Sequence, residues 1–481
     1  MNYYIRSRAA DIYFLHARSG DEGGEHGFFF LLRRGTTLSE HQYTTLDLFK
    51  LFTIIMPEVT DDTPVHLTEV DVDLDVQEIL LAASQHDNAK LRTLLRNQTT
   101  LPDAANVKDS ESGFTPLHAA IAACERDTES SDTQNGTSSE VTESNPKGLD
   151  TETLKSAVLT VKFLLQEGAI WNDLDTNNET PGCLARRIGA LELYDLIVDA
   201  GVRAELLLNR LDAYEELSDD DEEEEKEEGQ TETETEVEAE TAPELVDASA
   251  ETAAPTATPA NPDVSNPQYL ESQLNIQNDR ILDADQNGVM MAWESDIMRK
   301  SAKALLPTPG LKVLNIGHGM GIVDGFFQEQ GPAAHHIIEA HADVVAEMKR
   351  RGWDSKPGVV IHQGRWQDIL PGLVAEGEQF DAIYYDTFAE SYGDFREFFS
   401  EQVIGLLEQE GRWGFFNGMG ADRQISYDVY QKVAEMDLFE AGFDVQWEEI
   451  AVPKLEGEWE GVRRAYWVVD DYRLPLCKFM D

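Results

Sequence analysis

Val313-Leu314-Asn315-Ile316-Gly317-His318-Gly319-Met320-Gly321 is the stretch that decides the fold of the second half of this chain. An apolar run leads into a turn with glycines at alternate positions, and an amphipathic segment follows from Ile322 to Gln330. A β-strand that enters a helix through so small a loop lets backbone N–H groups face a ligand. Its spacing is G-x-G-x-G and not the complete G-x-G-x-x-G of dinucleotide-binding proteins, so a turn without a ligand remains an alternative.

A second short strand favours a ligand site. The run His335-His336-Ile337-Ile338-Glu339 ends in an acid 22 residues after Gly317. In a doubly wound sheet, an acid at this position binds the hydroxyls of a ribose. Together the two motifs predict a nucleoside-containing ligand at the carboxyl ends of neighbouring strands.

The composition is that of an acidic chain. Its 481 residues include 92 acids and 38 bases, for a formal net charge of −54. Such a charge repels nucleic acids and anionic membranes and attracts basic partners. The three cysteines (Cys124, Cys183 and Cys477) have no metal-binding or disulfide spacing, and no apolar run is long enough to span a bilayer. We therefore expect a monomeric cytoplasmic and nuclear protein without a metal site, a membrane contact or a direct nucleic acid contact.

The N-terminal half divides into an unassigned segment and a helical region. Residues 1–60 suit no domain, and we expect an extension or a misplaced start. From Asp75 the apolar spacing is helical, and Thr115-Pro116-Leu117-His118-Ala119-Ala120 resembles the opening of an ankyrin repeat. Asn178 to Ala185 repeats this opening with Cys183 in place of the histidine, and Leu193 to Gly201 reads as a helix that ends at its glycine.

We therefore predict an all-α domain of two to three ankyrin-like repeats over 75–212, with a disordered insertion at 125–150. A plain helical bundle is the alternative. We expect residues 213–267 to be an acidic disordered linker, because Asp219 to Glu225 is an unbroken acidic run and nothing around it can form a core. A solvated spacer is the simpler role for this linker, and a docking tail for a basic partner is the other.

The pattern of residues 268–481 is that of an α/β domain. Five strands alternate with helices, which predicts a parallel sheet covered on both faces. We expect these strands at 312–316, 335–339, 358–363, 380–386 and 411–417, and a terminal antiparallel pair at 443–452 and 464–469. The expected helices are 269–284, 290–306, 322–330, 342–351, 366–370 and 394–407. This is the plan of a class I (Rossmann-like) methyltransferase.

Five segments in this order resemble guanidinoacetate methyltransferase: residues 288–294, 313–323, 336–339, 364–368 and 380–387. With ankyrin-like units ahead of them, residues 60–481 resemble the fungal protein arginine N-methyltransferase 2 family. The resemblance implies S-adenosyl-L-methionine as cofactor and the internal δ-nitrogen of an arginine residue as the methyl acceptor. The implied partner is a basic protein substrate, namely a large-subunit ribosomal protein.

The resemblance also implies the site residues. The glycine turn would receive the amino-acid end of the cofactor, Glu339 its ribose, and later residues its adenine. The full cofactor set is Tyr269, Met290, Met298, Gly317, His318, Gly319, Met320, Gly321, Ile322, Val323, Glu339, Ala340, His341, Arg365, Trp366 and Asp386. The acid common at the end of the first strand in this fold is Asn315 here, which would weaken one polar contact to the cofactor.

Two carboxylates are the candidate catalytic residues. Asp386 follows the fourth strand at the carboxyl edge of the sheet, and Glu294 matches the guanidinoacetate enzyme. A guanidinium stays charged at neutral pH, and carboxylates can clamp it in two places. The alternatives are ordinary core packing for the methionines, a helix-face position for Glu294 and a helix cap for Asp386. Two other functions also remain open, a small-molecule guanidino methyltransferase and an ankyrin interaction scaffold with an inactive methyltransferase fold.

Overall fold

The computed structural model describes residues 12–14, 30–32, 68–97, 101, 103–125, 151–215 and 264–480. The chain separates into two compact units, Met1–Leu67 and Thr68–Asp481. In the first unit, β1 (Ile12–Phe14) pairs antiparallel with β2 (Phe30–Leu32). Most of the predicted extension at 1–60, of the insertion at 125–150 and of the linker at 213–267 lies outside the described residues.

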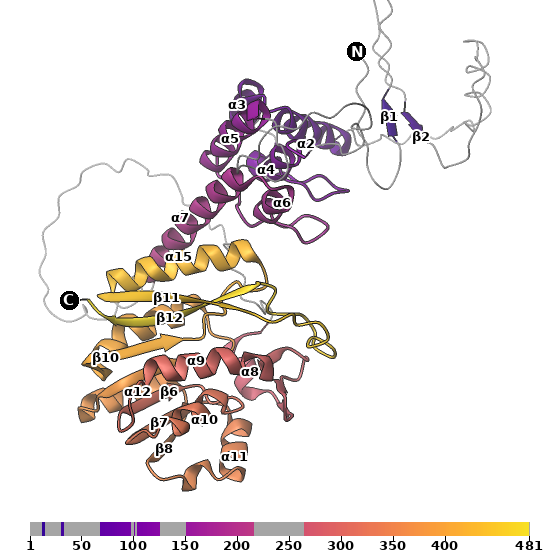
Figure 1. Ribbon diagram of the computed structural model, residues 1–481. Helices are drawn as coiled ribbons and strands as arrows, with labels where there is room; N and C mark the ends of the chain where they lie inside the picture. The colour runs from indigo at the N-terminus through magenta and orange to yellow at the C-terminus, as the bar shows by residue number, and fades with distance from the viewer. Residues whose placement is uncertain are drawn as a thin grey trace, which may run out of the picture. The chain divides into compact units, whose positions relative to one another are not determined.

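The second unit begins with helices arranged as successive pairs (Figure 1). The pairs are α2 (Thr68–Ser84) with α3 (Asn88–Asn97), α4 (Pro116–Ala122) with α5 (Thr151–Gln166), and α6 (Pro181–Ile188) with α7 (Leu191–Glu215). A short 3-10 turn, η1 (Ala104–Asn106), precedes α4. The prediction of an all-helical region is confirmed for the residues that the structure describes here.

The openings of α4 and α6 show why the two threonines recur. Thr115 precedes α4 with an extended backbone, and its side chain accepts a hydrogen bond from the backbone N–H of His118. Thr180 caps α6 in the same way, with Cys183 N 3.1 Å from its hydroxyl. His118 is fully buried, and its Nε2 lies 3.1 Å from the carbonyl of Glu179. This histidine therefore connects one helix pair to the next.

The predicted helix end at Gly201 is wrong, because α7 continues to Glu215. A Cβ at Gly201 would lie 2.8 Å from Cγ2 of Val429 and 3.0 Å from the ring of Trp171. The glycine is therefore a point of close packing in the middle of a helix, and it gives no stop signal. Residues 213–215 therefore belong to α7 and not to the predicted linker.

The C-terminal part of the second unit is built on a seven-stranded sheet in the order β11-β12-β10-β9-β6-β7-β8. Strands β6, β7, β8, β9 and β10 run parallel, and β11 and β12 are antiparallel. Their bounds are β6 (Lys312–Ile316), β7 (Ala334–Glu339), β8 (Val359–Gln363), β9 (Phe380–Tyr385), β10 (Leu407–Phe415), β11 (Phe443–Ala451) and β12 (Asp471–Phe479). The predicted Rossmann-like sheet with a terminal antiparallel pair is confirmed.

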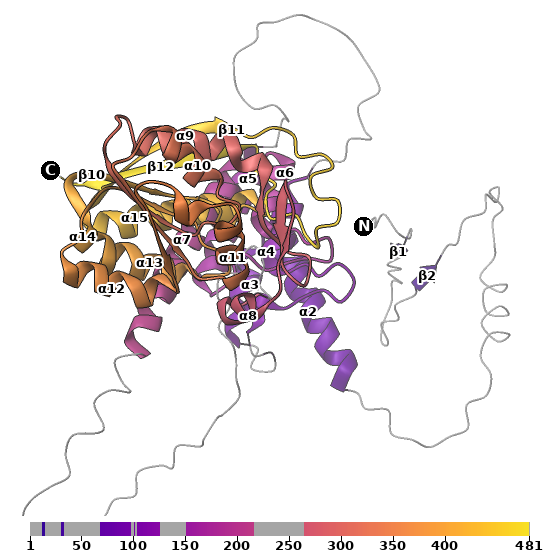
Figure 2. The ribbon, with the colours of Figure 1, turned by 90° about the horizontal axis from the view of Figure 1, so that it is seen from below.

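Helices cover both faces of this sheet (Figure 2). On one face, α9 (Ser295–Leu305) and α10 (Ile322–Glu329) share a core with Val313 of β6. On the other, the helices that share a core with Leu314 are α12 (Trp366–Glu376), α13 (Tyr392–Glu397), α14 (Val403–Leu406) and α15 (Gln424–Glu440). Helix α11 (Ala342–Arg350) packs beside β7. Alternate residues of β6 thus face opposite layers, as the pleat requires.

The segment before the sheet differs most from the prediction. The expected helix at 269–284 is only α8 (Asn266–Glu271), and a small antiparallel sheet follows, formed by β3 (Asn275–Ile276), β4 (Arg280–Leu282) and β5 (Gly288–Met291). The expected helix at 290–306 begins only at Ser295, after the 3-10 turn η2 (Ala292–Glu294). Pairing of Met290 with Ile281 outweighs the helical spacing of the apolar residues.

Further elements also differ from the prediction. Strand β10 begins at Leu407 and not at residue 411, and the expected helix 394–407 is divided into α13, the π-helix η4 (Phe398–Gln402) and α14. The last strand is β12 and not 464–469, because β12 forms nine consecutive pairs with β11 whereas Tyr466 and Trp467 pack in an aromatic cluster. Helix α12 was expected to end before Pro371 but runs through it to Glu376. Helix α15 was not predicted at all. None of the described helices is long and apolar enough to cross a membrane.

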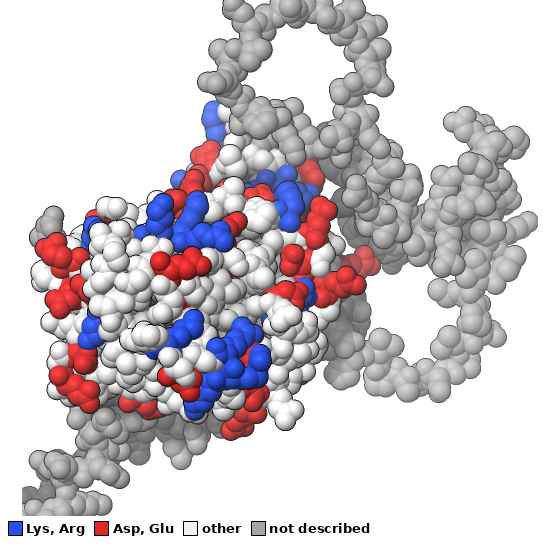
Figure 3. Space-filling model, turned by 60° about the horizontal axis from the view of Figure 1, so that its bottom comes forward, with Lys and Arg blue, Asp and Glu red and all other residues white. Residues whose placement is uncertain are grey.

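Helix α15 joins the helical pairs to the sheet. The Tyr194 hydroxyl on α7 donates to Asp428 of α15 (2.5 Å), and the Tyr430 hydroxyl on α15 donates to buried Glu205 of α7 (2.9 Å). One continuous core includes residues of α7, α15 and the sheet. The two regions are therefore packed as one body. On the face in Figure 3, basic and acidic side chains lie interspersed over the described surface, without a uniform acidic coat.

Candidate active site

The glycine turn lies between β6 and α10, as predicted. Gly317, Gly319 and Gly321 have φ angles of +89°, +54° and +77°. At Gly317 the requirement for glycine is strict, because a Cβ there would lie 1.8 Å from the backbone oxygen of Asp386. The turn therefore approaches the end of β9 more closely than any side chain would allow, which brings two carboxyl ends of the sheet together.

Glu339 ends β7 and holds the turn. Its Oε2 accepts from the backbone N–H groups of His318 (2.9 Å) and Gly319 (3.3 Å), and its Oε1 accepts from His341 N (2.7 Å). The residue is 6% exposed and lines the pocket described below. The predicted acid at the end of the second strand is thus placed beside the glycine turn, with its carboxylate fixed by backbone donors.

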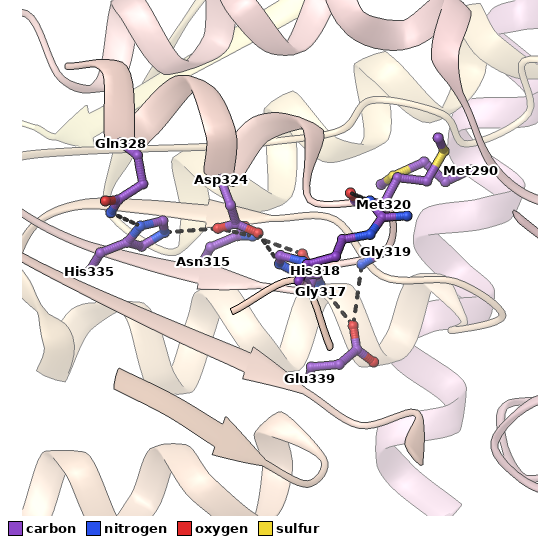
Figure 4. A network of polar contacts seen from close by, with 11 residues as sticks. Met290, Asn315, Gly317, His318, Gly319, Met320, Asp324, Gln328, His335 and Glu339 are labelled. Atoms are coloured by element: carbon purple, nitrogen blue, oxygen red, sulfur yellow. Dashed lines mark hydrogen bonds and ion pairs between the residues drawn. The ribbon is translucent and has the colours of Figure 1, made fainter. Parts of the chain in front are cut away.

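Asn315 contributes to a buried polar network (Figure 4). Its Nδ2 donates to Gly317 O (2.8 Å) and to Asp324 Oδ1 (2.9 Å). Asp324, on α10, also contacts Nδ1 of His318 (2.6 Å) and Nε2 of His335 (2.8 Å). Despite complete burial, the two histidines lower the pKa of Asp324 to about 2. Asn315 therefore holds the turn, and α10 supplies a buried acid next to it.

A pocket opens along the carboxyl ends of β6, β7, β8 and β9. It is lined by Asn266, Tyr269, Leu270, Val289, Met290, Ile316, Gly317, Gly319, Ile338, Glu339, Ala340, Gly364, Arg365, Trp366, Asp386, Thr387, Phe388 and Glu390. The Met290 sulfur accepts from the backbone N–H of Met320 (3.2 Å), which joins β5 to the glycine turn. The Tyr269 ring lies 4.9 Å from that of Phe388. Nine of the predicted site residues therefore share one pocket wall.

The other predicted residues lie behind this wall. Met298 and Val323 are fully buried in the core shared by α9 and α10. His341 caps α11, and its Nε2 lies 3.1 Å from the carbonyl of Tyr269. His318 faces the Asp324 network, and Gly321 begins α10. Met320 and Ile322 pack against the α9–α10 core. These residues support the turn and are not among those that line the pocket.

Two buried carboxyl groups influence each other here: Asp386 lines the pocket, whereas Glu294, at the end of η2, is not among the residues that line it. Glu294 is 3% exposed, and burial together with the nearby Asp386 charge raises its pKa well above its ordinary value. Burial, Asp324 and Glu339 raise the pKa of Asp386 to about 7. The Oδ2 atom of Asp386 is enclosed and has no hydrogen-bond partner. A buried acceptor without a partner costs stability, so the site suits a cationic, hydrogen-bond-donating ligand.

Sequence reasoning missed two side chains of this region. The Tyr466 hydroxyl donates to Oε1 of Glu294 from the segment between β11 and β12. Glu390 lines the pocket, where its carboxylate accepts from Trp366 Nε1 (2.9 Å) and from the Tyr385 hydroxyl. Glu390 stands only four residues after Asp386 and could have been noted, whereas nothing in the spacing of Tyr466 points to Glu294.

Comparison with known proteins identifies the family. Residues 266–455 match the model of the guanidinoacetate N-methyltransferase family. The chain is 71% identical over 426 residues to a protein arginine N-methyltransferase 2 of Aspergillus oryzae, covering 88% of this chain and 100% of that protein. It is 69% identical over 425 residues to the Emericella nidulans protein of that name, covering 86% and 99% respectively. The chain belongs to the protein arginine N-methyltransferase 2 family.

A more distant member of the protein arginine N-methyltransferase 2 family also aligns over most of this chain. The Gibberella zeae protein is 44% identical over 439 residues, covering 86% of this chain and 94% of that protein. A solved precorrin-6y C5,15-methyltransferase from Geobacter metallireducens is 14% identical, covers 38% of this chain and 87% of its own, and has a TM-score of 0.28. That likeness is too weak to add to the assignment. The chain is an enzyme of the methyltransferase class.

Proposed function

We propose that this enzyme transfers the methyl group of S-adenosyl-L-methionine to the δ-nitrogen of an arginine residue in a basic protein. The observation that carries the proposal is the pair of buried carboxyl groups, Glu294 and Asp386, of which Asp386 has an unpartnered oxygen at the pocket. Burying two neighbouring acids is unfavourable unless a cation joins them. A guanidinium is a permanent planar cation with donors on three nitrogens, and two carboxylates can bind it along two edges.

The pocket suits the cofactor in both shape and chemistry. Close packing leaves no room for a Cβ at Gly317, and a Cβ at Gly319 would lie 2.7 Å from the Met290 thioether. Glu339 would accept from the ribose hydroxyls, and the glycine turn would bind the amino-acid end. Arg365 and Trp366 would flank the adenine with Ala340 beside it, and Tyr269 and Met290 would close over the cofactor. His341 and Met298 would support these residues from behind the pocket wall. When bound, S-adenosylmethionine supplies an electrophilic methyl group on a sulfonium.

The residues of the chain would position the acceptor nitrogen. Transfer from a sulfonium needs the nitrogen on the axis of the sulfur–methyl bond with its lone pair directed at the carbon. The Asp386 and Glu294 carboxylates would fix the guanidinium plane and stabilise the cation. One of them would accept the proton that the acceptor nitrogen loses as its bond to the methyl carbon forms and the sulfur–carbon bond breaks. Since both groups are removed from bulk water, their attraction for the cation is stronger than it would be at the surface.

The helical pairs are proposed to be ankyrin-like repeats that recruit the substrate protein. The Thr115 and Thr180 caps and the His118 contact to the next pair support this proposal. The expected substrate is a large-subunit ribosomal protein, whose basic character would complement the net charge of −54. We further propose a monomer that works in the cytoplasm and the nucleus without binding membranes or nucleic acid.

A small-molecule guanidino methyltransferase is the second candidate, because residues 266–455 match the guanidinoacetate family. Incubation of the full chain with labelled S-adenosylmethionine separates the two functions. Basic ribosomal proteins are offered in one reaction and free guanidinoacetate in the other. Label in a ribosomal protein supports the proposal, and label in guanidinoacetate alone rejects it. Fragmentation of the methylated peptide then shows whether the internal or a terminal nitrogen carries the methyl group.

A further inference from the structure

The segment between β11 and β12, residues 452–470, contacts Glu294 from behind the site, and none of its residues lines the pocket described above. Nη1 of Arg280 donates to the carbonyls of Glu458 (3.2 Å) and Glu460 (2.9 Å). The backbone N–H of Arg463 donates to Gln286 O (2.8 Å). These bonds fasten the segment to the β4–β5 hairpin, whose end leads directly to Glu294. Most of the segment follows residue 455, where the match to the guanidinoacetate family ends.

Tyr466 is the residue of this segment that reaches the carboxyl pair. Its hydroxyl donates to Oε1 of Glu294, and its ring packs so close to Gly288 that a Cβ there would lie 2.8 Å from Cε1 of Tyr466. The rings of Trp459 and Trp293 lie 4.9 Å and 6.1 Å from the Tyr466 ring. The tyrosine is therefore held on several sides, and its hydroxyl has a defined direction.

The Tyr466 hydroxyl favours the ionised form of Glu294. A carboxyl group that is 3% exposed and faces a second acid favours its protonated form, which cannot attract a guanidinium. A donor to one oxygen stabilises the ionised form and fixes the rotation of the carboxyl plane. A backbone hydrogen bond from Met291 also favours the ionised form of Glu294. Glu294 would lose both its charge and its orientation more easily without this tyrosine.

We infer that Tyr466 is a positioning residue, whose hydroxyl holds the Glu294 carboxylate ionised and directed toward the substrate guanidinium. The inference rests on the proposed role of Glu294 in binding the acceptor. Tyr466 lies in a segment that is largely outside the match to the guanidinoacetate family, and its positioning role goes beyond the activity of the family. The competing explanation is that the hydroxyl merely fills a polar position in an aromatic cluster.

Tyr466→Phe tests the inference, since it removes one oxygen and keeps the ring. Loss of a hydrogen bond to a charged group predicts a fall in kcat/KM for the protein substrate of about 10- to 150-fold. The acid limb of the pH profile of kcat/KM should move to higher pH, because removing a donor makes the Glu294 carboxylate harder to form. Cofactor affinity, measured by calorimetry, should stay unchanged. An unmoved acid limb with wild-type kcat/KM overturns the inference.

Tyr392→Phe is the matched control. The Tyr392 hydroxyl also donates to a buried carboxylate, that of Asp437 (2.7 Å), but neither residue lines the pocket. Both variants should lose comparable thermal stability, and only Tyr466→Phe should move the acid limb. If the Tyr392→Phe acid limb moves equally, the effect is structural and the inference fails.

A double-mutant cycle with Glu294→Gln separates this inference from the proposed function. If Tyr466 acts through Glu294, adding Tyr466→Phe to Glu294→Gln should lower kcat/KM by less than about threefold. Independent, multiplying losses would overturn the inference and leave the role of Glu294 intact. If Glu294→Gln alone keeps wild-type turnover, the proposed role of Glu294 fails first, and the inference fails with it.

Discussion

Replacing Asp386 by asparagine should make the enzyme inactive and, at alkaline pH, more stable. The carboxyl group of Asp386 has a pKa of about 7 in the folded protein, against an ordinary value of 3.8. A raised carboxyl pKa means that the folded protein keeps a proton that the unfolded chain has already lost. The resulting loss of stability accumulates as the pH rises from about 4 and is complete above about 7.

The size of the effect follows from these two pKa values. Their difference, at 1.36 kcal/mol for each pKa unit, corresponds to about 4 kcal/mol at pH 8. At pH 5 only about 1.7 kcal/mol of that cost is present, because pH 5 is just over one unit above the pKa of the carboxyl group in the unfolded chain. The stability of Asp386→Asn relative to the wild type should therefore be about 2 to 3 kcal/mol more favourable at pH 8 than at pH 5. Removing the Asp386 charge also relieves Glu294, which acts in the same direction.

Urea unfolding of both proteins at pH 5 and pH 8 measures this difference, and the titration of all unrelated groups cancels in it. The new amide has its own packing cost, which is the same at both pH values and cancels too. Methyl transfer to the protein substrate should be lost at both pH values while cofactor binding is largely retained. An equal stability difference at pH 5 and pH 8 would show that Asp386 does not titrate as a buried acid, and the reasoning would be refuted.

Three other substitutions test separate parts of the structure. Glu294→Gln should lower turnover about 100-fold, because a preorganised charge is lost, while cofactor affinity measured by calorimetry stays largely intact. Turnover near the wild-type value would show that Glu294 has no part in the mechanism. Gly317→Ala should abolish cofactor binding, because its Cβ would lie 1.8 Å from a backbone oxygen, whereas Gly325→Ala meets no atom within 4 Å and should bind normally. Gly201→Ala should cost about 1 to 3 kcal/mol of stability by thermal unfolding, while Gly372→Ala, with open space around it, should not destabilise; similar midpoints would contradict the close packing of α7.

The elements that the sequence predicts well are those whose signal is local. The apolar run of β6 and the three glycines after it define a strand, a turn and a helix without reference to the rest of the chain. Glu339 could be placed beside that turn because parallel strands end at the same edge of a sheet. The same rule placed Asp386 at this edge, and the pocket contains both residues.

The features that escaped prediction depend on partners far away in the chain. Met290 has helical spacing but lies on β5, since β4 supplies hydrogen bonds that periodicity cannot reveal. Gly201 looks like a helix stop, and only the approach of Val429 from α15 explains it. The link from Tyr466 to Glu294 spans 172 residues. In each case the local sequence is compatible with more than one structure, and tertiary contacts decide which one forms.

Helix α15 contacts both the helical pairs, which are proposed to recruit the substrate, and the sheet that carries the active site. Its Asp428 accepts from Tyr194 of α7 and, through Oδ1, from Arg473 of β12 (2.8 Å). Strand β12 follows directly on the segment that carries Tyr466. A protein bound by the helical pairs would therefore be held on elements that are linked to the segment that contacts Glu294. A flexible basic segment of the substrate would have to span the remaining distance, so the position of an arginine along that segment should decide whether it is methylated.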